Sequence, residues 1–360
     1  MQTKRINLAL QGGGAHGAYT WGVLDRLLEE DRFEVEAISG TSAGAMNAAV
    51  FADGMGRGGR ADVKRALETF WRNISHAAQY GPLQPSPFDQ ASNGWNLDHS
   101  AAFIAFDLLT RMLSPCQLNP TNYNPLRQVL ERSVDFKRLE ACRAVNLFIS
   151  ASNVKTGKVR VFKSGEITPD VLLASACLPF LFQAVTIDGE PYWDGGYMGN
   201  PAIFPLIYGA ETADVVIVQV NPLGCDRIPT TATEIMNRLN EISFNSSLMR
   251  EMRSVSFVTD LIDQGKLDPN QYKHVNVHWI EAERQMRGLG VSSKLNARMD
   301  FLLLLKEIGR DVAERWIATH FDAIGERSTI DISARPSSQR QGTALRAMGL
   351  SRLDQGLHGS

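Results

Sequence analysis

The sequence predicts an α/β protein built around a mostly parallel sheet, and three observations lead to this prediction. Of the 360 residues, 44% are hydrophobic and 21% are charged, which suits a globular chain with a sizeable core. Near the N-terminus, two short apolar runs are each followed by glycines and then by a helical pattern. Further apolar runs of strand length recur later in the chain. This order of strand, loop and helix is typical of a parallel α/β sheet.

Hydrophobic periodicity and glycine content assign the elements near the N-terminus. Short apolar runs predict strands, and Trp21, Leu24 and Leu28 share one face of a predicted helix. An alanine-rich run predicts a second helix that packs tightly on the sheet. In chain order, we expect a strand over 6–10, a helix over 17–30, a strand over 35–39, a helix over 43–51 and a glycine-rich loop over 54–59.

The later elements follow from the same signals. Apolar runs predict further strands, and one of them forms a hairpin after Thr156 and Gly157. The stretch 187–193 is expected to be a strand or hairpin that leads into a glycine turn. The other expected strands are 145–150, 159–163, 215–220 and 275–280, and the expected long helices are 233–262 and 295–323.

Residues 1–324 are expected to form a single domain, and two segments of the chain depart from the pattern above. Residues 80–123 are rich in proline and hold one strongly apolar stretch, 101–113. They are expected to form either a cap inserted over the sheet edge or an ordinary helical layer. The segment 325–360 is polar throughout, and we expect it to be a disordered tail.

Charge and cysteine content exclude several classes of function. Lys plus Arg number 37 and Asp plus Glu number 39, which argues against nucleic acid as a partner because phosphate binding needs clustered positive charge. The four cysteines lie far apart without a C-x-x-C pair, so neither a disulfide framework nor a zinc site is expected. The chain is therefore expected in a reducing, cytoplasmic compartment. The sequence does not determine its oligomeric state.

Membrane-directed segments are not expected. The apolar run 6–10 is too short for the core of a signal peptide. The uncharged stretch between Asp170 and Asp188 falls short of a membrane span and holds a proline. Any membrane contact is expected to be peripheral.

Ser42 is the candidate nucleophile. It is the central residue of the G-x-S-x-G motif Gly40 to Gly44, between a predicted strand and a predicted helix. The glycines permit a tight turn, and the dipole at the helix N-terminus favours developing negative charge. By itself, the motif fits a capping serine in a glycine-rich turn equally well.

The glycines at 12–14 form the candidate oxyanion hole. They follow the first strand, and their backbone N–H groups can approach a substrate oxygen closely. Adjacent strands would bring Gly12, Gly13 and Gly14 to the same sheet edge as the serine. The same segment also matches the G-x-G-x-x-G fingerprint through Gly17, which indicates a nucleotide-binding oxidoreductase as an alternative. That motif needs an acidic residue at the end of the second strand, where none is found.

A serine nucleophile requires a base, and Asp194 is the candidate. It begins the turn Asp194-Gly195-Gly196, and a carboxylate there can accept the serine proton directly. A D-G-G turn is common and by itself is usually structural. The seven histidines lie in no obvious catalytic setting; they are His16, His76, His99, His274, His278, His320 and His358.

The three motifs together resemble those of the patatin-like phospholipases. The segments 11–17, 40–44 and 194–196 occur in the order and spacing of that family. The connecting segments 174–179 and 187–193 are similar to it as well, and the resemblance covers residues 5–220.

The resemblance implies a three-layer α/β/α fold that hydrolyses acyl esters of phospholipids or related lipids without a metal or other cofactor. It implies a dyad of Ser42 and Asp194 and an oxyanion loop of Gly12, Gly13 and Gly14. One departure is His16, because the family loop usually carries Lys or Arg there, where it can position the loop or an anionic substrate. A catalytically silent lipid-binding protein of the same fold is the remaining alternative.

Overall fold

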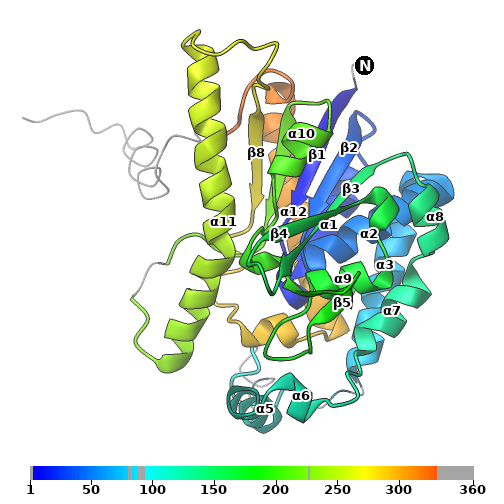
Figure 1. Cartoon of the computed structure of the whole chain (residues 1–360), viewed down its shortest axis with the longest axis vertical. Helices are drawn as coiled ribbons and strands as arrows, with labels where there is room; N and C mark the ends of the chain where they lie inside the picture. Colours follow the sequence, from blue (N-terminus) through cyan, green and yellow to red (C-terminus); the bar gives the residue numbers. More distant parts are fainter. Residues whose placement is uncertain are drawn as a thin grey trace, which may run out of the picture.

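The computed structural model describes residues 3–79, 81, 83–86, 89, 94–225 and 228–330. These residues form an eight-stranded mixed sheet with helices on both faces (Figure 1), which confirms the predicted three-layer α/β/α fold. The path of hydrogen-bonded neighbours is β5-β6-β3-β2-β1-β7-β8, and β4 pairs with β3 beside it. The strands are β1 Lys4–Leu10, β2 Phe33–Gly40, β3 Asn146–Asn153, β4 Val159–Lys163, β5 Val185–Ile187, β6 Glu190–Asp194, β7 Asp214–Gln219 and β8 Asn276–Glu281.

The sheet is parallel through β3, β2, β1, β7 and β8, and antiparallel where β4, β5 and β6 join it. Parallel neighbours bring the carboxyl ends of their strands to one edge of the sheet, so the loops after β1 and β2 lie side by side. The hairpin predicted after Thr156 and Gly157 is confirmed between β3 and β4. The stretch predicted as a strand or hairpin belongs to a hairpin of β5 and β6.

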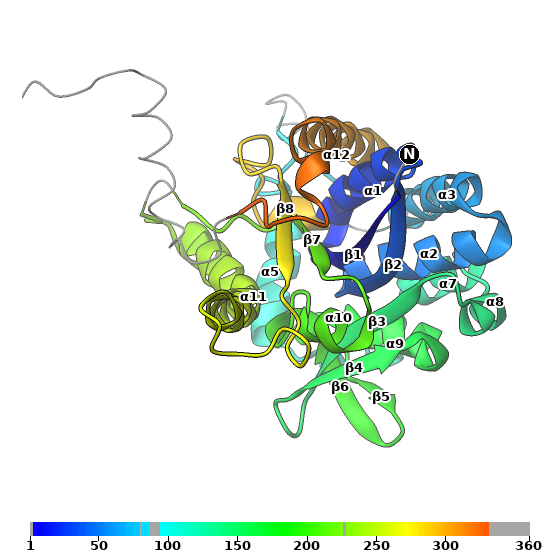
Figure 2. The ribbon, with the colours of Figure 1, turned by 90° about the horizontal axis from the view of Figure 1, so that it is seen from above.

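Alternating side chains divide the core between the two faces of the sheet (Figure 2). In β1, Leu8 and Leu10 face a cluster that includes Trp21, Phe51 and Phe301 from helices α1, α2 and α12. Ala9 faces the opposite cluster, which α10 and α11 complete. The long helices are α1 Gly17–Leu27, α2 Ala43–Gly58, α3 Arg60–Gln79, α11 Ala232–Asp263 and α12 Met299–His320.

Shorter helices cover the ends and edges of the sheet. Those of the α type are α5 Ala101–Met112, α6 Pro115–Leu118, α7 Pro125–Ser133, α8 Phe136–Ala141, α9 Pro169–Ser175 and α10 Phe204–Gly209. The 3-10 helices are η1 Gly14–His16, η2 Ser164–Glu166, η3 Gly195–Tyr197, η4 Ser292–Leu295 and η5 Phe321–Ala323.

The prediction of a loop over 54–59 is wrong, because α2 continues to Gly58. Gly54 serves helix packing instead of a turn, whereas Gly59, at φ 85°, ends α2. A Cβ on Gly54 would lie 2.6 Å from the Cα of Val63, so the absent side chain lets α2 and α3 approach closely. Glycine in a helix costs roughly 1 kcal/mol relative to alanine, and this close packing offsets that cost.

The beginning of the predicted tail also differs from expectation. Residues 325–330 run along β8, where the amide of Thr329 donates to Val277 O at 3.0 Å. The amide of Gly325 donates to the Asp214 carboxylate at 2.8 Å. The rest of the predicted tail, 331–360, lies outside the described residues.

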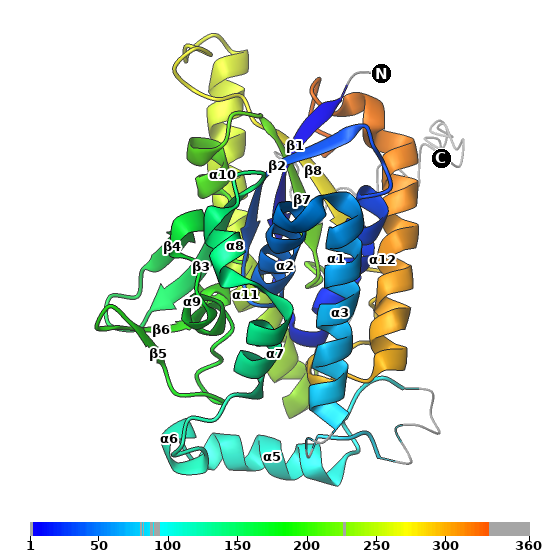
Figure 3. The same ribbon diagram turned by 90° about the vertical axis from the view of Figure 1, so that its right-hand side faces the viewer.

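The segment predicted as a cap or a helical layer lies beyond the carboxyl ends of the parallel strands (Figure 3). Its main element is α5, which runs across that end of the molecule and buries none of its side chains. Tyr80, Pro82 and several residues between 87 and 93 lie outside the described residues. None of the described helices has the length and apolar content needed to cross a bilayer.

Candidate active site

Ser42 occupies a sharp turn between β2 and α2. Its backbone adopts φ 54° and ψ −122°, a conformation that costs free energy in a residue other than glycine. The glycines on either side are sterically required. A Cβ on Gly40 would lie 2.7 Å from the carbonyl oxygen of Gly44, and one on Gly44 would lie 2.2 Å from that of Leu10. The turn therefore presents Ser42 at the carboxyl end of the sheet and at the N-terminus of α2.

The sheet register brings Asp194 to this serine. Gly40, the last residue of β2, pairs with Ile149 of β3. Strand β6 pairs with the part of β3 that extends past this point, where Asp194 lies opposite Ala151. Both β2 and β6 lie on the side of β3 away from β4, so β6 continues the line of β2. As a result, Asp194 lies close enough to Ser42 for the serine hydroxyl to influence the pKa of its carboxyl group.

The Asp194 side chain is buried at the beginning of the glycine turn. Its Oδ1 accepts a hydrogen bond of 2.7 Å from the amide of Gly196. Burial raises the pKa of Asp194 to about 7, since a charged carboxylate is disfavoured away from water. The hydrogen bond from Gly196, the nearby Ser42 hydroxyl and the positive charge of Lys294 act in the opposite direction and lower this pKa. A carboxyl group with this pKa can take up and release a proton near neutral pH.

The glycine loop after β1 lies against Ser42, but its three amides differ. A Cβ on Gly12 would lie 2.7 Å from the Cβ of Ser42, so only glycine fits there. The Gly12 amide donates to Asn200 Oδ1 at 2.7 Å. Gly13 is half-buried and Gly14 is exposed, and within the described residues no acceptor is recorded for the amide of either. Among these three amides, that of Gly12 is already bound to a side-chain acceptor.

Buried amide side chains hold this loop in place. Gln11 donates to the carbonyl oxygen of Asn200 at 3.2 Å and to Asn245 Oδ1 at 3.1 Å. Its own Oε1 accepts from the amides of Val220 and Asn221 at 2.9 and 3.0 Å. Asn221 donates in turn to Gly12 O at 2.8 Å. A buried network whose members bond one another restricts the loop to one conformation.

Ser175 and Asn200 are site residues that the sequence did not predict. The amide of Ser42 donates to Ser175 Oγ at 2.9 Å, and Ser175 is fully buried at the end of α9. Ser175 belongs to the segment 174–179, whose likeness to the family indicated importance but no role. Asn200 follows η3 and belongs to no short motif, so its contact with Gly12 follows from the fold alone.

The histidines for which contacts are described are engaged elsewhere. His16 is buried, and its Nε2 lies 2.8 Å from Ser293 Oγ. Burial lowers the pKa of His16 to about 3, so its ring is neutral near pH 7. His278 pairs with Asp214 at 2.8 Å, and His274 pairs with Asp263 at the surface. No hydrogen bond or ion pair is described between these three histidines and Ser42, and the dyad of Ser42 and Asp194 stays a prediction.

The structure also bears on the nucleotide-binding alternative. The acidic residue Glu36 accepts a hydrogen bond of 2.9 Å from the amide of Thr212, which precedes β7. Because β7 runs parallel to β1 and β2, this contact lies toward the amino ends of the strands. The glycine loop lies at their carboxyl ends, so Glu36 is not placed to bind a ribose there.

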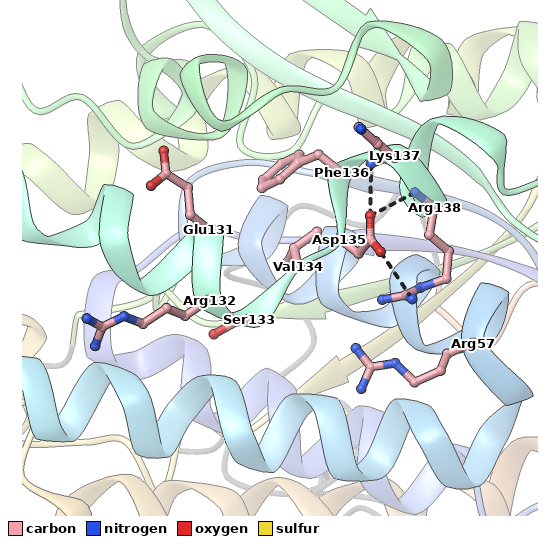
Figure 4. A pocket seen from close by; sticks show the side chains of 9 residues that line it. All are labelled: Arg57, Glu131, Arg132, Ser133, Val134, Asp135, Phe136, Lys137 and Arg138. Carbon is pink, nitrogen blue, oxygen red and sulfur yellow. Dashed lines mark hydrogen bonds and ion pairs between the residues drawn. The ribbon is translucent and has the colours of Figure 1, made fainter.

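A separate surface hollow of about 480 Å³ lies between the end of α2 and helices α7 and α8 (Figure 4). Arg57 and Arg138 line it, and both bind the buried Asp53, at 3.2 and 2.8 Å. Arg57 lies in the last turn of α2, and Ser42 precedes the first turn of the same helix. The hollow is therefore distinct from the serine site.

The fold and the serine turn define an α/β protein with a potential hydrolase site. Residues 8–207 match the family described as patatin-like phospholipase, and the chain belongs to that family. Membership supports a lipid acyl hydrolase. A comparison with curated proteins gives no match.

Several solved structures share a similar arrangement at low sequence identity. VipD from Legionella pneumophila is 17% identical, with a TM-score of 0.40 over 88% of this chain and 67% of VipD. A chain of the heterodimeric complex ExoU-SpcU from the type III secretion system of Pseudomonas aeruginosa is 15% identical. Its TM-score is 0.38 over 89% of this chain and 53% of the matched chain. The type III effector protein ExoU is 17% identical, with a TM-score of 0.33 over 88% of this chain and 54% of the ExoU chain. This chain spans about half the length of the ExoU chains.

Proposed function

We propose that this protein is a serine acyl hydrolase that cleaves ester bonds of phospholipids or related lipids through a dyad of Ser42 and Asp194. The observation that carries the proposal is the closeness of the buried Asp194 carboxyl group to Ser42, which follows from the sheet register and makes the serine hydroxyl influence the pKa of Asp194. The strained turn at Ser42 and the glycine loop beside it support the same chemistry. Family membership supports the lipid class of substrate.

In the proposed reaction, Ser42 Oγ attacks the ester carbonyl carbon while Asp194 accepts the hydroxyl proton. The new bond gives a tetrahedral intermediate with an oxyanion. When this intermediate collapses, the alcohol leaves and takes the proton from Asp194. A water molecule then attacks the acyl-enzyme and gives its proton to Asp194, and the fatty acid is released as Ser42 regains its proton.

The amides of Gly13 and Gly14 are the proposed donors to the oxyanion, together with the N-terminal end of α2. Donors already held in position at the developing charge contribute strongly to catalysis. The amide of Gly12 is bound to Asn200, so we assign Gly12 a different role within the predicted loop. It lets the loop contact Ser42 closely and fixes the direction of the next two amides.

Labelling with a fluorophosphonate probe tests the proposal directly. Such probes react with an activated serine, so we expect covalent modification of the native protein at Ser42, located by peptide mass spectrometry. Heat-denatured protein serves as the control and should not react. Absence of labelling would favour a catalytically silent lipid-binding protein. A rise in unfolding temperature with NAD(P), without labelling, would favour the nucleotide-binding alternative.

We further propose that residues 1–324 act as one hydrolase domain whose insertion 80–123 meets a lipid surface. Large apolar side chains are exposed at the end of the molecule where β2 ends, on α5 and on the first turns of α11 (Figure 1). We call this set the apolar rim, and it consists of Ile104, Leu108, Leu109, Met112, Ile235, Met236, Leu239 and Ile242. An exposed apolar surface around an active site is suited to peripheral contact with a bilayer.

The double substitution Ile104→Ser and Leu108→Ser is expected to lower hydrolysis of vesicle phospholipid at least about 10-fold more than that of a water-soluble ester. The two side chains are 55% and 57% exposed, so replacing them should change the free energy of unfolding little. Each contributes about 1.5–3 kcal/mol when it enters an apolar phase. Initial rates on both substrates measure the effect. The control is Phe257→Ser, an exposed residue in the second half of α11. Equal losses on the two substrates would contradict membrane contact.

A further inference from the structure

A lysine from outside the matched family region reaches the glycine loop. Lys294 lies in η4, beyond residues 8–207. Its backbone packs directly on the loop, because a Cβ on Gly14 would lie 2.5 Å from Lys294 O. Its Nζ donates to Asn221 Oδ1 at 2.6 Å, and Asn221 donates to Gly12 O at 2.8 Å. Both the backbone and the side chain of Lys294 are therefore fixed relative to the loop.

The charge of Lys294 is not neutralised by an ion pair in the described part of the chain. Glu241 is near enough to influence its pKa, but that carboxylate pairs with Arg238 at 2.9 Å. Asn221 is an uncharged acceptor and uses one of the three N–H donors of the ammonium group. Burial lowers the pKa of Lys294 to about 8, which leaves it mainly protonated at neutral pH. A half-buried cation with free donors is suited to binding an anion.

No other cation described in the structure has the same relation to the site. Lys294 is the one described group whose positive charge lowers the pKa of Asp194. His16, within the loop itself, is neutral near pH 7 and is bonded to Ser293. An anionic substrate that approaches the Asp194 carboxylate would be repelled by it, and Lys294 offsets this repulsion.

We propose that Lys294 binds the phosphate of a glycerophospholipid whose ester is cleaved at Ser42, an inference that rests on the proposed function. The Gly12 end of the loop contacts Ser42, and the Gly14 end contacts the backbone of Lys294. The Lys294 ammonium group is linked to Gly12 O through Asn221, so the nucleophile and the cation both lie beside the loop. A substrate carbonyl held by the loop amides would lie between them. Only the glycerol carbons and ester oxygens separate this carbonyl from the phosphodiester. Lys294 thereby favours phospholipids over neutral glycerides.

Replacing Lys294 with Met tests this role by comparing two substrates in the same nonionic micelles. The substrates are phosphatidylglycerol and the diacylglycerol with identical acyl chains. The ratio of kcat/KM for the phospholipid to that for the diacylglycerol is expected to fall about 10- to 100-fold, the range typical of a lost charge-assisted hydrogen bond. Lys294→Arg keeps the charge and should retain most of the ratio. In the unmodified protein, the ratio should fall as pH rises through 8 because Lys294 loses its proton. The ionisation of Asp194 affects kcat/KM for both substrates equally, so it does not change the ratio.

Two matched variants separate phosphate binding from loop positioning. Gln11→Ala removes a side chain that holds the loop but does not bond Lys294, so it should lower kcat/KM for both substrates equally. Lys158→Met, at an exposed site between β3 and β4, should change neither. If Lys294→Met leaves the ratio unchanged and lowers both rates as Gln11→Ala does, the proposal is overturned.

A binding measurement keeps this test independent of the catalytic proposal. The Ser42→Ala protein is titrated calorimetrically with a short-chain dialkyl-ether analogue of phosphatidylglycerol, which has no ester to cleave. Adding Lys294→Met should weaken binding about 10-fold or more, and unchanged affinity would overturn the phosphate site. Failure of the dyad itself would appear instead as absence of fluorophosphonate labelling in the native protein.

Discussion

Replacing Ser42 with Ala is expected to abolish lipid hydrolysis, with a fall in kcat of at least about 10³-fold. The hydroxyl oxygen forms the covalent bond to the acyl group in the proposed reaction, and no neighbouring side chain can replace it. Alanine fits the same turn, because Ser42 makes its contacts with Ser175 and Met46 through its backbone. Release of fatty acid from phosphatidylglycerol micelles measures the loss.

The matched control for this variant is Ser254→Ala, which removes an exposed hydroxyl on α11 that donates to the carbonyl oxygen of Arg250. Both variants should unfold within a few degrees of the unmodified protein. A Ser42→Ala protein that keeps more than about one tenth of the activity would exclude Ser42 as the nucleophile.

Replacing Asp194 with Asn is expected to lower kcat by about 10³-fold or more while it stabilises the fold. The amide cannot accept the Ser42 proton, but its oxygen can still accept the hydrogen bond from Gly196. The folded-state pKa of about 7 exceeds that of an unfolded aspartate, so ionising Asp194 costs the native state free energy. The stability associated with the neutral acid is therefore lost as pH rises from the unfolded-state pKa through about 7.

At pH 8, the Asp194→Asn protein would avoid this cost because its amide stays uncharged, and it should unfold at a higher temperature than the unmodified protein. Calorimetric unfolding at pH 8 and kcat for a soluble ester provide the two measurements. Loss of activity together with a lower unfolding temperature would indicate misfolding instead of loss of the base. Retained activity would show that Asp194 does not accept the proton.

The same pKa sets the pH dependence of the unmodified enzyme. Asp194 acts as a base only when it is ionised, so kcat/KM should fall about tenfold for each pH unit well below 7 and level off above it. The residual activity of Asp194→Asn should not show this fall in kcat/KM below pH 7. The pH profile of kcat/KM is measured only over the pH range in which circular dichroism shows an intact fold.

Much of the fold was predictable because it depends on local sequence. The strand 159–163 was predicted with the bounds that the structure gives to β4. The loop predicted at 54–59 was wrong because glycine has two uses, in turns and in close helix packing. The contact between Gly54 and Val63 decides between these uses, and local sequence does not specify that contact.

The sequence by itself indicated the turn around Ser42, because the steric limit on Gly40 comes from Gly44, a few residues away in the chain. The limit on Gly44 comes from Leu10 on the neighbouring strand and therefore belongs to the tertiary structure. The sequence also indicated Asp194 through its glycine turn and its resemblance to a family. Only the tertiary structure showed how Asp194 reaches Ser42, because that depends on β6 folding back along β3 past the end of β2. The placement of Asn200 and Lys294 beside the glycine loop was likewise decided by the tertiary structure. Backbone sterics depend on neighbouring residues, whereas these contacts join distant segments that only the completed sheet brings together.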